Sequence, residues 1–327
     1  MKTSNSPGQS MAPSNSLAQV MRRHPLFFFY LMAYAFSWLA WLPLVLSQEG
    51  RPLSPFHTTL IWVIIVTISS TLAAFGPTLS AFIMTGITEG KSGIGRLLRR
   101  YVLWRVGFQW YLFVLIGIPA LILLSILVLP GAIAAFRAPA PGFVITYLVS
   151  YVVIFILGGP LGEEPGWRGF ALPRWQQRSG PLVGTLFLGV LWGLWHLPLF
   201  LTPGYNGAGT GFVGISIPFI EFVIGITALA VIFTWVFNNT RGSLLLVMLL
   251  HASFNTAFNT FLLRLFPSLP GHSPVFQSLY IVLIVVALLI ILATRGRLSY
   301  QRYQRETALP APVTDREQEL GTADTSV

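Results

Sequence analysis

Three short segments of this 327-residue chain place ionisable side chains inside otherwise apolar sequence. The first is GEEPGWRG, from Gly162 to Gly169, and the second is WGLWH, ending at His196. The third is HASFN, from His251 to Asn255. Ionisable groups within apolar spans are costly, so they usually face a protein interior or a water-filled cavity and carry function. These segments are therefore the first candidates for an active site.

The first segment divides its two carboxylates between two roles. Adjacent residues on a helix point about 100° apart, so Glu163 and Glu164 should have different partners. Glu164 and Arg168 are four residues apart and can pair on one face. Glu163 is left without an obvious local cation, and a carboxylate in a partly dry pocket can serve as a general base. We predict chemistry for Glu163 and a structural role for the Glu164–Arg168 pair; the alternative is a solvated charge cluster on a surface turn.

Helix-breaking residues crowd around these carboxylates. They are Gly158, Gly159, Pro160, Gly162, Pro165 and Gly166. Proline removes a helical hydrogen bond and disfavours helix in the residue before it, which predicts a break or kink here. Broken backbone at membrane depth is tolerated only where it is buried in protein or lines a cavity. The first segment should therefore open onto a polar pocket.

The histidines of the other two segments could serve the same pocket. His196 lies in an apolar segment without a charged residue, and Trp192, one turn earlier, can pack against its imidazole. His251 and Asn255 project from one helix face and can present two groups to one substrate oxygen, as an oxyanion site requires. Asn259 continues that face. The alternatives are a structural His196 and a His251–Asn255 pair that only ties helices together.

The composition places these segments in a membrane. Hydrophobic residues make up 54% of the chain and charged residues 9%, and the mean hydropathy is +0.71. Soluble domains carry about a quarter charged residues, so this chain lacks the polar surface of a soluble globule. The absence of cysteine excludes disulfides, thiol catalysis and cysteine–zinc sites. The net charge of +10 does not indicate nucleic-acid binding, because the arginines flank apolar segments.

The apolar runs predict an all-α, polytopic membrane helix bundle over residues 25–294, in an integral membrane protein that we expect in a bacterial inner membrane. The polar segments 1–24 and 306–327 are predicted to be disordered tails. The eight expected spans are 25–47, 59–86, 109–132, 143–160, 181–201, 217–237, 243–263 and 275–294.

The basic residues predict that both termini are cytoplasmic. The connections on one side hold Lys2, Arg22, Arg23, Lys91, Arg96, Arg99, Arg100, Arg105, Arg168, Arg174, Arg178, Arg241, Arg295, Arg297, Arg302 and Arg305. Those on the opposite side hold Arg51, Arg137 and Arg264. Residues 95–107 interleave four arginines with leucines and aromatics, which favours an amphipathic helix in the cytoplasmic interface over a plain basic loop.

Depth decides whether the three segments can meet. His196 follows Pro181 by fifteen residues, or about 22 Å of helix, whereas Glu163 follows the apparent cytoplasmic end of the fourth span. The segments converge only if the fourth span extends beyond residue 160 or the fifth begins outside the membrane. We favour a long fourth segment that is interrupted near Pro165 and continues towards Arg178.

In order and spacing, the three motifs resemble those of the CPBP (Abi) family, which includes type II CAAX prenyl endopeptidases and bacteriocin-processing proteins. That family shows two glutamates followed by arginine, then aromatic-x-x-x-His, then His-x-x-x-Asn or Asp, each on its own membrane helix. Here the motifs read Glu163-Glu164-x-x-x-Arg168, Trp192-x-x-x-His196 and His251-x-x-x-Asn255. The resemblance covers about residues 95–262. It departs from the family pattern in Trp192, which is usually phenylalanine, and in Pro165.

The resemblance implies an intramembrane endopeptidase that acts on a membrane-embedded or membrane-associated protein or peptide. Glu163 and His196 would activate water, His251 and Asn255 would stabilise the oxyanion, and Glu164 and Arg168 would hold the loop. No cofactor is favoured, and zinc held by His196, His251 and Glu163 is the alternative. The rival functions are a non-catalytic scaffold or immunity factor of the same fold, and an ion-coupled transporter, for which the sequence lacks an internal repeat.

Overall fold

A computed structural model describes residues 16–46, 60–202, 205–269 and 272–307, and these ranges contain helices and no strand. The helices are α1 (Leu17–Arg23), α2 (Pro25–Leu46), α3 (Leu60–Ala74), α4 (Gly76–Tyr101), α5 (Phe108–Leu112), the π-helix η1 (Phe113–Gly117), α6 (Ile118–Leu127), α7 (Ala132–Ala135), α8 (Phe143–Leu157), α9 (Pro160–Glu164), the π-helix η2 (Pro165–Ala171), α10 (Leu172–Ser179), α11 (Pro181–Trp195), the 3-10 helices η3 (Leu197–Leu201) and η4 (Tyr205–Gly207), α12 (Gly211–Asn239), α13 (Leu244–Thr260), the π-helix η5 (Phe261–Leu265), α14 (His272–Ala293) and α15 (Tyr300–Thr307).

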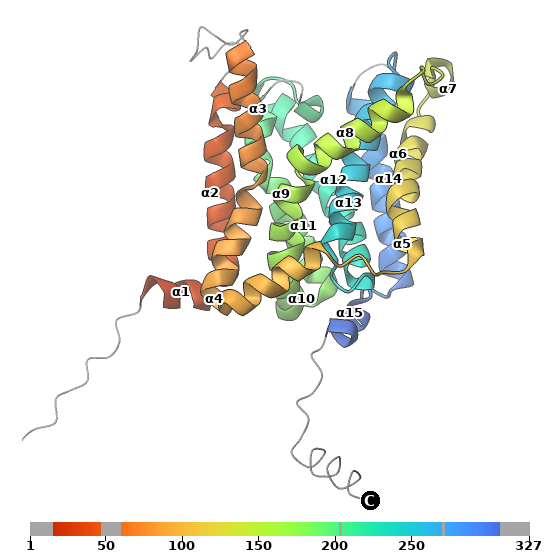
Figure 1. Cartoon of the computed structure of the whole chain (residues 1–327). Helices are drawn as coiled ribbons and strands as arrows, with labels where there is room; N and C mark the ends of the chain where they lie inside the picture. The colour runs from red at the N-terminus through yellow and green to blue at the C-terminus, as the bar shows by residue number, and fades with distance from the viewer. Residues whose placement is uncertain (1–15, 47–59, 203–204, 270–271, 308–327) are drawn as a thin grey trace, which may run out of the picture.

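Eight stretches within the described residues are long and apolar enough to cross a membrane, which confirms the predicted polytopic bundle (Figure 1). They are Pro25–Leu46, Ile64–Tyr101, Phe108–Leu127, Phe143–Ser179, Pro181–Leu201, Gly211–Asn239, Leu244–Leu265 and Pro274–Ala293. The second and fourth stretches extend well beyond the predicted spans. The longer fourth stretch is the one that the convergence of the three motifs requires.

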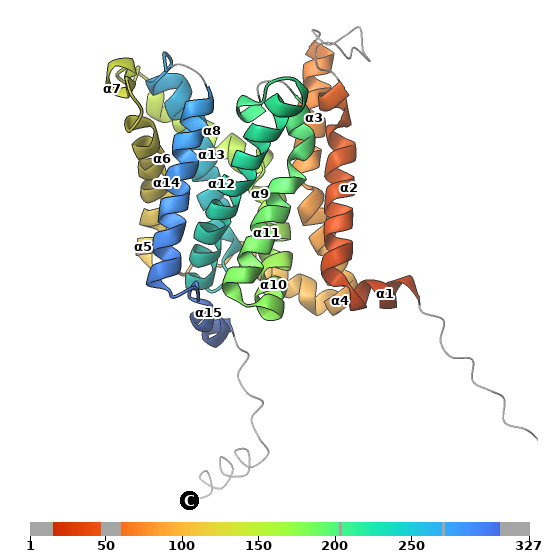
Figure 2. The same ribbon diagram turned by 180° about the vertical axis from the view of Figure 1, so that it is seen from behind.

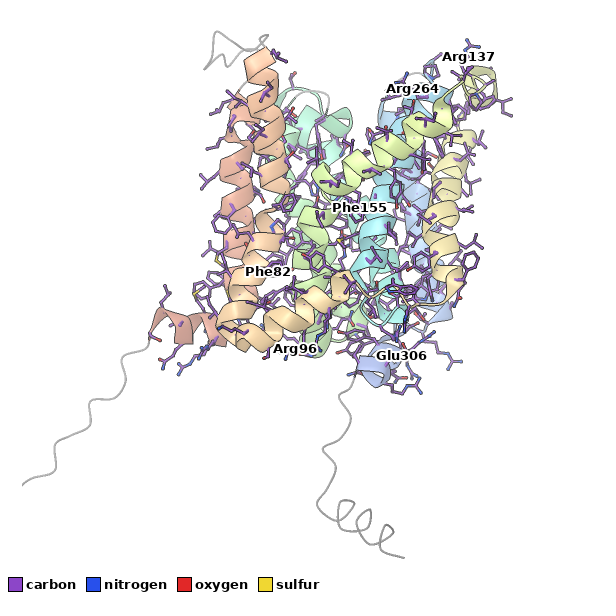
Figure 3. The ribbon with its side chains drawn as sticks, in the orientation of Figure 1. Phe82, Arg96, Arg137, Phe155, Arg264 and Glu306 are labelled. Carbon is purple, nitrogen blue, oxygen red and sulfur yellow. The ribbon has the colours of Figure 1, made fainter. Side chains whose placement is uncertain are left out.

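Three basic residues mark the two ends of the bundle (Figure 3), whereas Arg168, predicted to lie in a connection on one side, is fully buried. Arg96 lies at one end, near Glu306, and Arg137 and Arg264 lie at the other (Figure 3). Both α1 and α15 lie at the end that carries Arg96, as the two opposite views show (Figures 1 and 2). The described chain therefore begins and finishes at the same end, while the assignment of that end to the cytoplasm stays a prediction. Arg51 lies outside the described residues.

The helix α4 bends at Gly90, whose backbone is non-helical with φ 65° and ψ −159°. The part of α4 after this bend lies across the end of the bundle (Figure 1). The amphipathic helix predicted over 95–107 is thus present, but it ends at Tyr101, and residues 102–107 are not helical.

The prediction of a disordered tail over residues 1–24 is wrong for the described part, because α1 forms there. Ser16 caps the helix: its hydroxyl accepts from the backbone N–H of Gln19, and the Gln19 side chain accepts from the backbone N–H of Ser16. Arg22 then ties α1 to α4 by donating to the carbonyl of Ile87 at 2.7 Å. Of the second predicted tail, Glu306 and Thr307 end α15 and the rest lies outside the described residues.

The fourth span breaks at Gly158 and Gly159, between α8 and α9, and its α-helix is interrupted again at Pro165, near the predicted position, where a π-helix begins. Gly159 has φ 107°, a backbone conformation that favours glycine. The chain passes through Pro165 as the π-helix η2. Proline cannot donate to the carbonyl four residues earlier, which belongs to Leu161, and the hydroxyl of Thr78 donates to that carbonyl at 3.4 Å instead. This bond from α4 supplies a donor for the carbonyl that Pro165 cannot bond.

The helix that precedes the break packs loosely. None of the side chains of α8 is buried, and the helix runs obliquely across the bundle (Figure 1). The hydroxyl of Tyr151 on α8 donates to the carbonyl of Leu249 on α13 at 2.7 Å.

The helix that follows the break packs closely against the α3–α4 junction. A Cβ atom added to Gly162 would lie 2.6 Å from the carbonyl oxygen of Ala74, a separation that real Cβ atoms do not show. Small residues allow such backbone contact between membrane helices. Gly162 therefore fixes the position of Glu163 relative to α4.

We expect Gly162→Ala to lower the free energy of unfolding by about 1–3 kcal/mol, since the added methyl overpacks this contact. Gly95→Ala is the matched control, because its Cβ would meet no atom within 4 Å and alanine favours helix by up to about 1 kcal/mol. Unfolding of the two variants in detergent, followed by circular dichroism, measures the difference. Equal changes in the free energy of unfolding for the two variants would contradict the close contact of Gly162 with Ala74.

Candidate active site

The three motifs line one cavity of about 830 Å³ inside the bundle. Glu163 on α9, Trp192 on α11 and His196 at the end of α11 line it together with His251 and Asn255 on α13. These helices neighbour one another in the middle of the bundle in both views (Figures 1 and 2). The structure therefore brings together the segments that the sequence analysis singled out.

Glu163 is a buried carboxylate with a fixed orientation. Its side chain is only 5% exposed, and Oε2 accepts hydrogen bonds from Nε1 of Trp192 at 2.7 Å and, at a longer 3.4 Å, from Nε1 of Trp167. Its other oxygen, Oε1, faces Gly159, where a Cβ atom would collide with it. Within the described residues no ion pair involves Glu163, as the sequence analysis expected. Two indoles thus aim a carboxylate that no cation neutralises directly.

Glu164 pairs with Arg168 as predicted, and it has a second partner that was not predicted. Its Oε1 lies 3.1 Å from Nη1 of Arg168 and 2.8 Å from Nδ1 of His251. Both Glu164 and Arg168 are fully buried. Because the carboxylate accepts at Nδ1, the Nε2 atom of His251 remains for other partners. Glu164 therefore orients a histidine from another helix in addition to pairing with the arginine of its own segment.

Two aromatic rings enclose the Arg168 guanidinium. Its Cζ lies 4.1 Å from the ring centre of Trp192 and 4.3 Å from that of Phe233. Desolvated cation–π contacts of this kind compensate part of the cost of burying a charge. Phe233, on α12, also packs edge-on against His251, with the ring centres 5.8 Å apart. Phe233 was not predicted as a site residue, since nothing in its local pattern separates it from other apolar residues of its span.

His196 is held in one tautomer by its own helix. Its Nδ1 lies 2.9 Å from the backbone carbonyl of Trp192, which can only accept, so Nδ1 carries the proton and Nε2 is the bare nitrogen. The predicted packing on Trp192 is present, with ring centres 6.3 Å apart. Trp195 and Phe222 enclose the imidazole more closely, at 4.7 and 5.0 Å. A neutral imidazole with a free Nε2 suits proton acceptance.

The predicted polar face of α13 lines the cavity over three turns. His251, Asn255 and Asn259 all contribute to the cavity wall. Nδ2 of Asn255 lies 3.4 Å from the carbonyl of Gly158 at the break, and Nδ2 of Asn259 donates to the carbonyl of Asn255 at 2.8 Å. Amide and imidazole groups therefore face the cavity opposite the break in the fourth span.

The donor set for the zinc alternative is dispersed. Among the described residues, no three His, Asp or Glu side chains gather closely enough to hold a metal ion. Glu163, His196 and His251 line one cavity without forming the three-ligand cluster that catalytic zinc sites use. Zinc stays an alternative for experiment to decide.

Comparison with known proteins gives further information on the segment that contains the candidate site residues. Residues 143–257 match the family model described as type II CAAX prenyl endopeptidase Rce1-like. The chain is similar to this family over those residues. It is also 28% identical over 186 residues to CAAX prenyl protease 2 of Methanococcus maripaludis, and this alignment covers 54% of the chain and 68% of that relative. The match and the relative's name support an intramembrane endopeptidase of the CAAX prenyl protease type.

The matched range contains all six candidate residues, from Glu163 to Asn255. The range of the match is narrower than the predicted 95–262. These findings favour a protease in a multi-pass membrane protein over an ion-coupled transporter. The bacterial inner membrane stays a prediction.

Breaking the buried Glu164–Arg168 ion pair should lower the free energy of unfolding. Arg168→Met leaves the fully buried Glu164 without its guanidinium partner, which typically destabilises a protein by about 3–5 kcal/mol. The double variant Glu164→Gln, Arg168→Met removes both charges and should recover much of that loss. Unfolding of both variants in detergent tests this non-additivity.

Arg302 and Glu306 provide the matched control, because they form an i,i+4 pair at 2.8 Å that is largely exposed. Arg302→Met should change the free energy of unfolding by less than about 1 kcal/mol. Similar losses at Arg168 and Arg302 would show that the buried pair does not carry the stability assigned to it.

Proposed function

We propose that the chain hydrolyses a peptide bond of a membrane-embedded or membrane-associated protein or peptide, with Glu163 and His196 activating the attacking water. The observation that carries this proposal is the fixed, buried carboxylate of Glu163 beside a cavity that two histidines share. A general base needs a positioned acceptor atom and room for the molecule that it deprotonates. Oε1 of Glu163 and Nε2 of His196 are acceptors of this kind.

In the proposed reaction, a proton passes from water to Glu163 as the water oxygen attacks the substrate carbonyl carbon. The carbonyl oxygen becomes an oxyanion that accepts hydrogen bonds from Nδ2 of Asn255 and Nε2 of His251. Because Nδ1 of His251 already donates to Glu164, its Nε2 can donate only in the imidazolium form, whose charge the Glu164 carboxylate balances. Glu163 then returns the proton to the leaving amine as the C–N bond breaks.

The remaining cavity wall supports an apolar substrate segment. Val153, Ile154 and Leu157 of α8 and Leu262 and Leu263 beyond α13 line the cavity away from the carboxylate. An apolar wall with a few placed polar groups is typical of sites that bind mostly apolar ligands. The relative's name, CAAX prenyl protease 2, makes a prenylated peptide one candidate substrate for this chain.

Glu163→Gln should lower kcat by about 10²–10⁴-fold, since the amide cannot accept the proton from water. The assay is cleavage of a membrane-peptide library, prenylated peptides included, by purified protein in detergent. Glu221→Gln is the matched control: Glu221 lies on α12, accepts from Nε2 of Gln277 at 2.9 Å and is not part of the cavity wall. Full activity of Glu163→Gln with an unchanged unfolding temperature would contradict the proposed base.

The same assay separates the metal-free scheme from the zinc alternative. In the metal-free scheme, the rate is unchanged after exhaustive treatment with a chelator, because the general base is the Glu163 carboxylate itself. Elemental analysis of the treated protein confirms that metal has been removed. Activity that disappears with the metal and returns on addition of zinc would assign His196, His251 and Glu163 as ligands in place of the scheme above.

A further inference from the structure

A second cleft, of about 250 Å³, lies outside the catalytic cavity and shares no wall residue with it. Three arginines line it, Arg96 and Arg100 from α4 and Arg174 from α10, together with Glu89 of α4 and Tyr303 of α15. We call this site the arginine cleft. It lies at the end of the bundle that carries α1 and α15, where Figure 3 shows Arg96 at the edge.

The charges in the arginine cleft do not balance. Glu89 forms ion pairs with Arg96, at 2.6 Å, and with Arg174. Arg100 has no carboxylate partner among the described residues; it donates to the hydroxyl of Tyr303 at 3.0 Å and to the carbonyl of Gly169 at 3.3 Å. One carboxylate against three guanidinium groups leaves a formal excess of two positive charges.

The arginines also retain free donors. Each guanidinium has five N–H groups, and the bonds named above use only some of them. Arg96 is exposed, and among the described residues no nitrogen of Arg100 or Arg174 is both buried and unpaired, so solvent can reach donors of these arginines. Guanidinium groups bind phosphate oxygens through paired hydrogen bonds in a fixed planar geometry. The arginine cleft therefore has the charge, the donors and the volume for a phosphate group.

The surroundings of the cleft indicate where the phosphate comes from. The part of α4 that carries Arg96 and Arg100 lies across the end of the bundle (Figure 1). Beside them Leu98 is 49% exposed, and Trp104, just after the helix, is 59% exposed. Exposed apolar side chains among basic residues are typical of a helix at the membrane interface, and basic groups there attract anionic lipids.

We propose that the arginine cleft binds the phosphate group of an anionic phospholipid. Binding would hold together the elements that line the cleft, α4, α10 and α15. It would also act on η2, because Arg100 donates to the carbonyl of Gly169 and Arg174 donates to that of Phe170 at 2.9 Å. The π-helix η2 contains Arg168, so the lipid site and the catalytic constellation share one helix.

Lipid binding is measured on the full chain in neutral detergent, without any peptide substrate. Phosphatidylglycerol, phosphatidylcholine and inorganic phosphate are titrated separately while the unfolding temperature is recorded, since a ligand of the folded state raises it. Phosphatidylglycerol should raise the temperature in a saturable manner, and the other two probes should have little effect. An equal rise with phosphatidylcholine, or with phosphate alone, would overturn the proposal of an anionic lipid.

Arg96→Gln should weaken the apparent Kd for phosphatidylglycerol by about five-fold, as loss of one interfacial charge predicts. Arg99→Gln is the matched control: Arg99 is exposed on the same helix and does not line the cleft. Because the Kd is taken from the titration, a changed starting temperature of either variant does not affect the comparison. Equal weakening by both variants would mean diffuse attraction to a basic surface and would refute a defined site.

Discussion

The buried carboxylate of Glu164 is the contact on which the rest of the site depends. It accepts from Arg168 one turn along the same segment and from His251 on α13, and so links the π-helix to the helix that carries the third motif. A buried charge is tolerated only with partners that satisfy it. Because Arg168 is itself enclosed by Trp192 and Phe233, the contact also involves α11 and α12. Four segments thus meet around one ion pair, and Glu163, the next residue, is placed by the same assembly.

The sequence predicted the parts of this arrangement that depend on spacing along one helix. The Glu164–Arg168 pair and the shared face of His251 and Asn255 follow from a separation of four residues, and both are present. The indole bonds that aim Glu163 could not be predicted in this way. Trp167 belongs to the same segment as Glu163. Trp192 lies 29 residues from Glu163 on another helix, and only the packing of the helices brings Trp192 and Glu163 together.

The fourth span also shows that contacts between helices could not be predicted from the sequence. A long segment was predicted from the depth at which the motifs had to meet, and the structure has it. An interruption was expected near Pro165 from the local rule that proline ends helices, and the α-helix does change there to the π-helix η2. The full break at Gly158 and Gly159 and the hydrogen bond from Thr78, on a different helix, to the carbonyl of Leu161 were not predicted. The eight spans could be predicted from length and hydropathy, whereas hydrogen bonds between helices could not.

The loose packing of α8 gives the catalytic cavity walls of unequal stiffness. In the span that begins with α8, only 11% of the most apolar window is buried within the protein, against 61% in the span of α13. Displacing α8 would uncover none of its own buried side chains, because it has none, whereas displacing α13 would open the interior of the bundle. The two glycines at the end of α8 leave it connected to the carboxylate segment through flexible backbone, and Tyr151 ties it to α13. The cavity is thus bounded by one helix that has no buried side chain and by another, mostly buried in the protein, that bears the imidazole and amide groups.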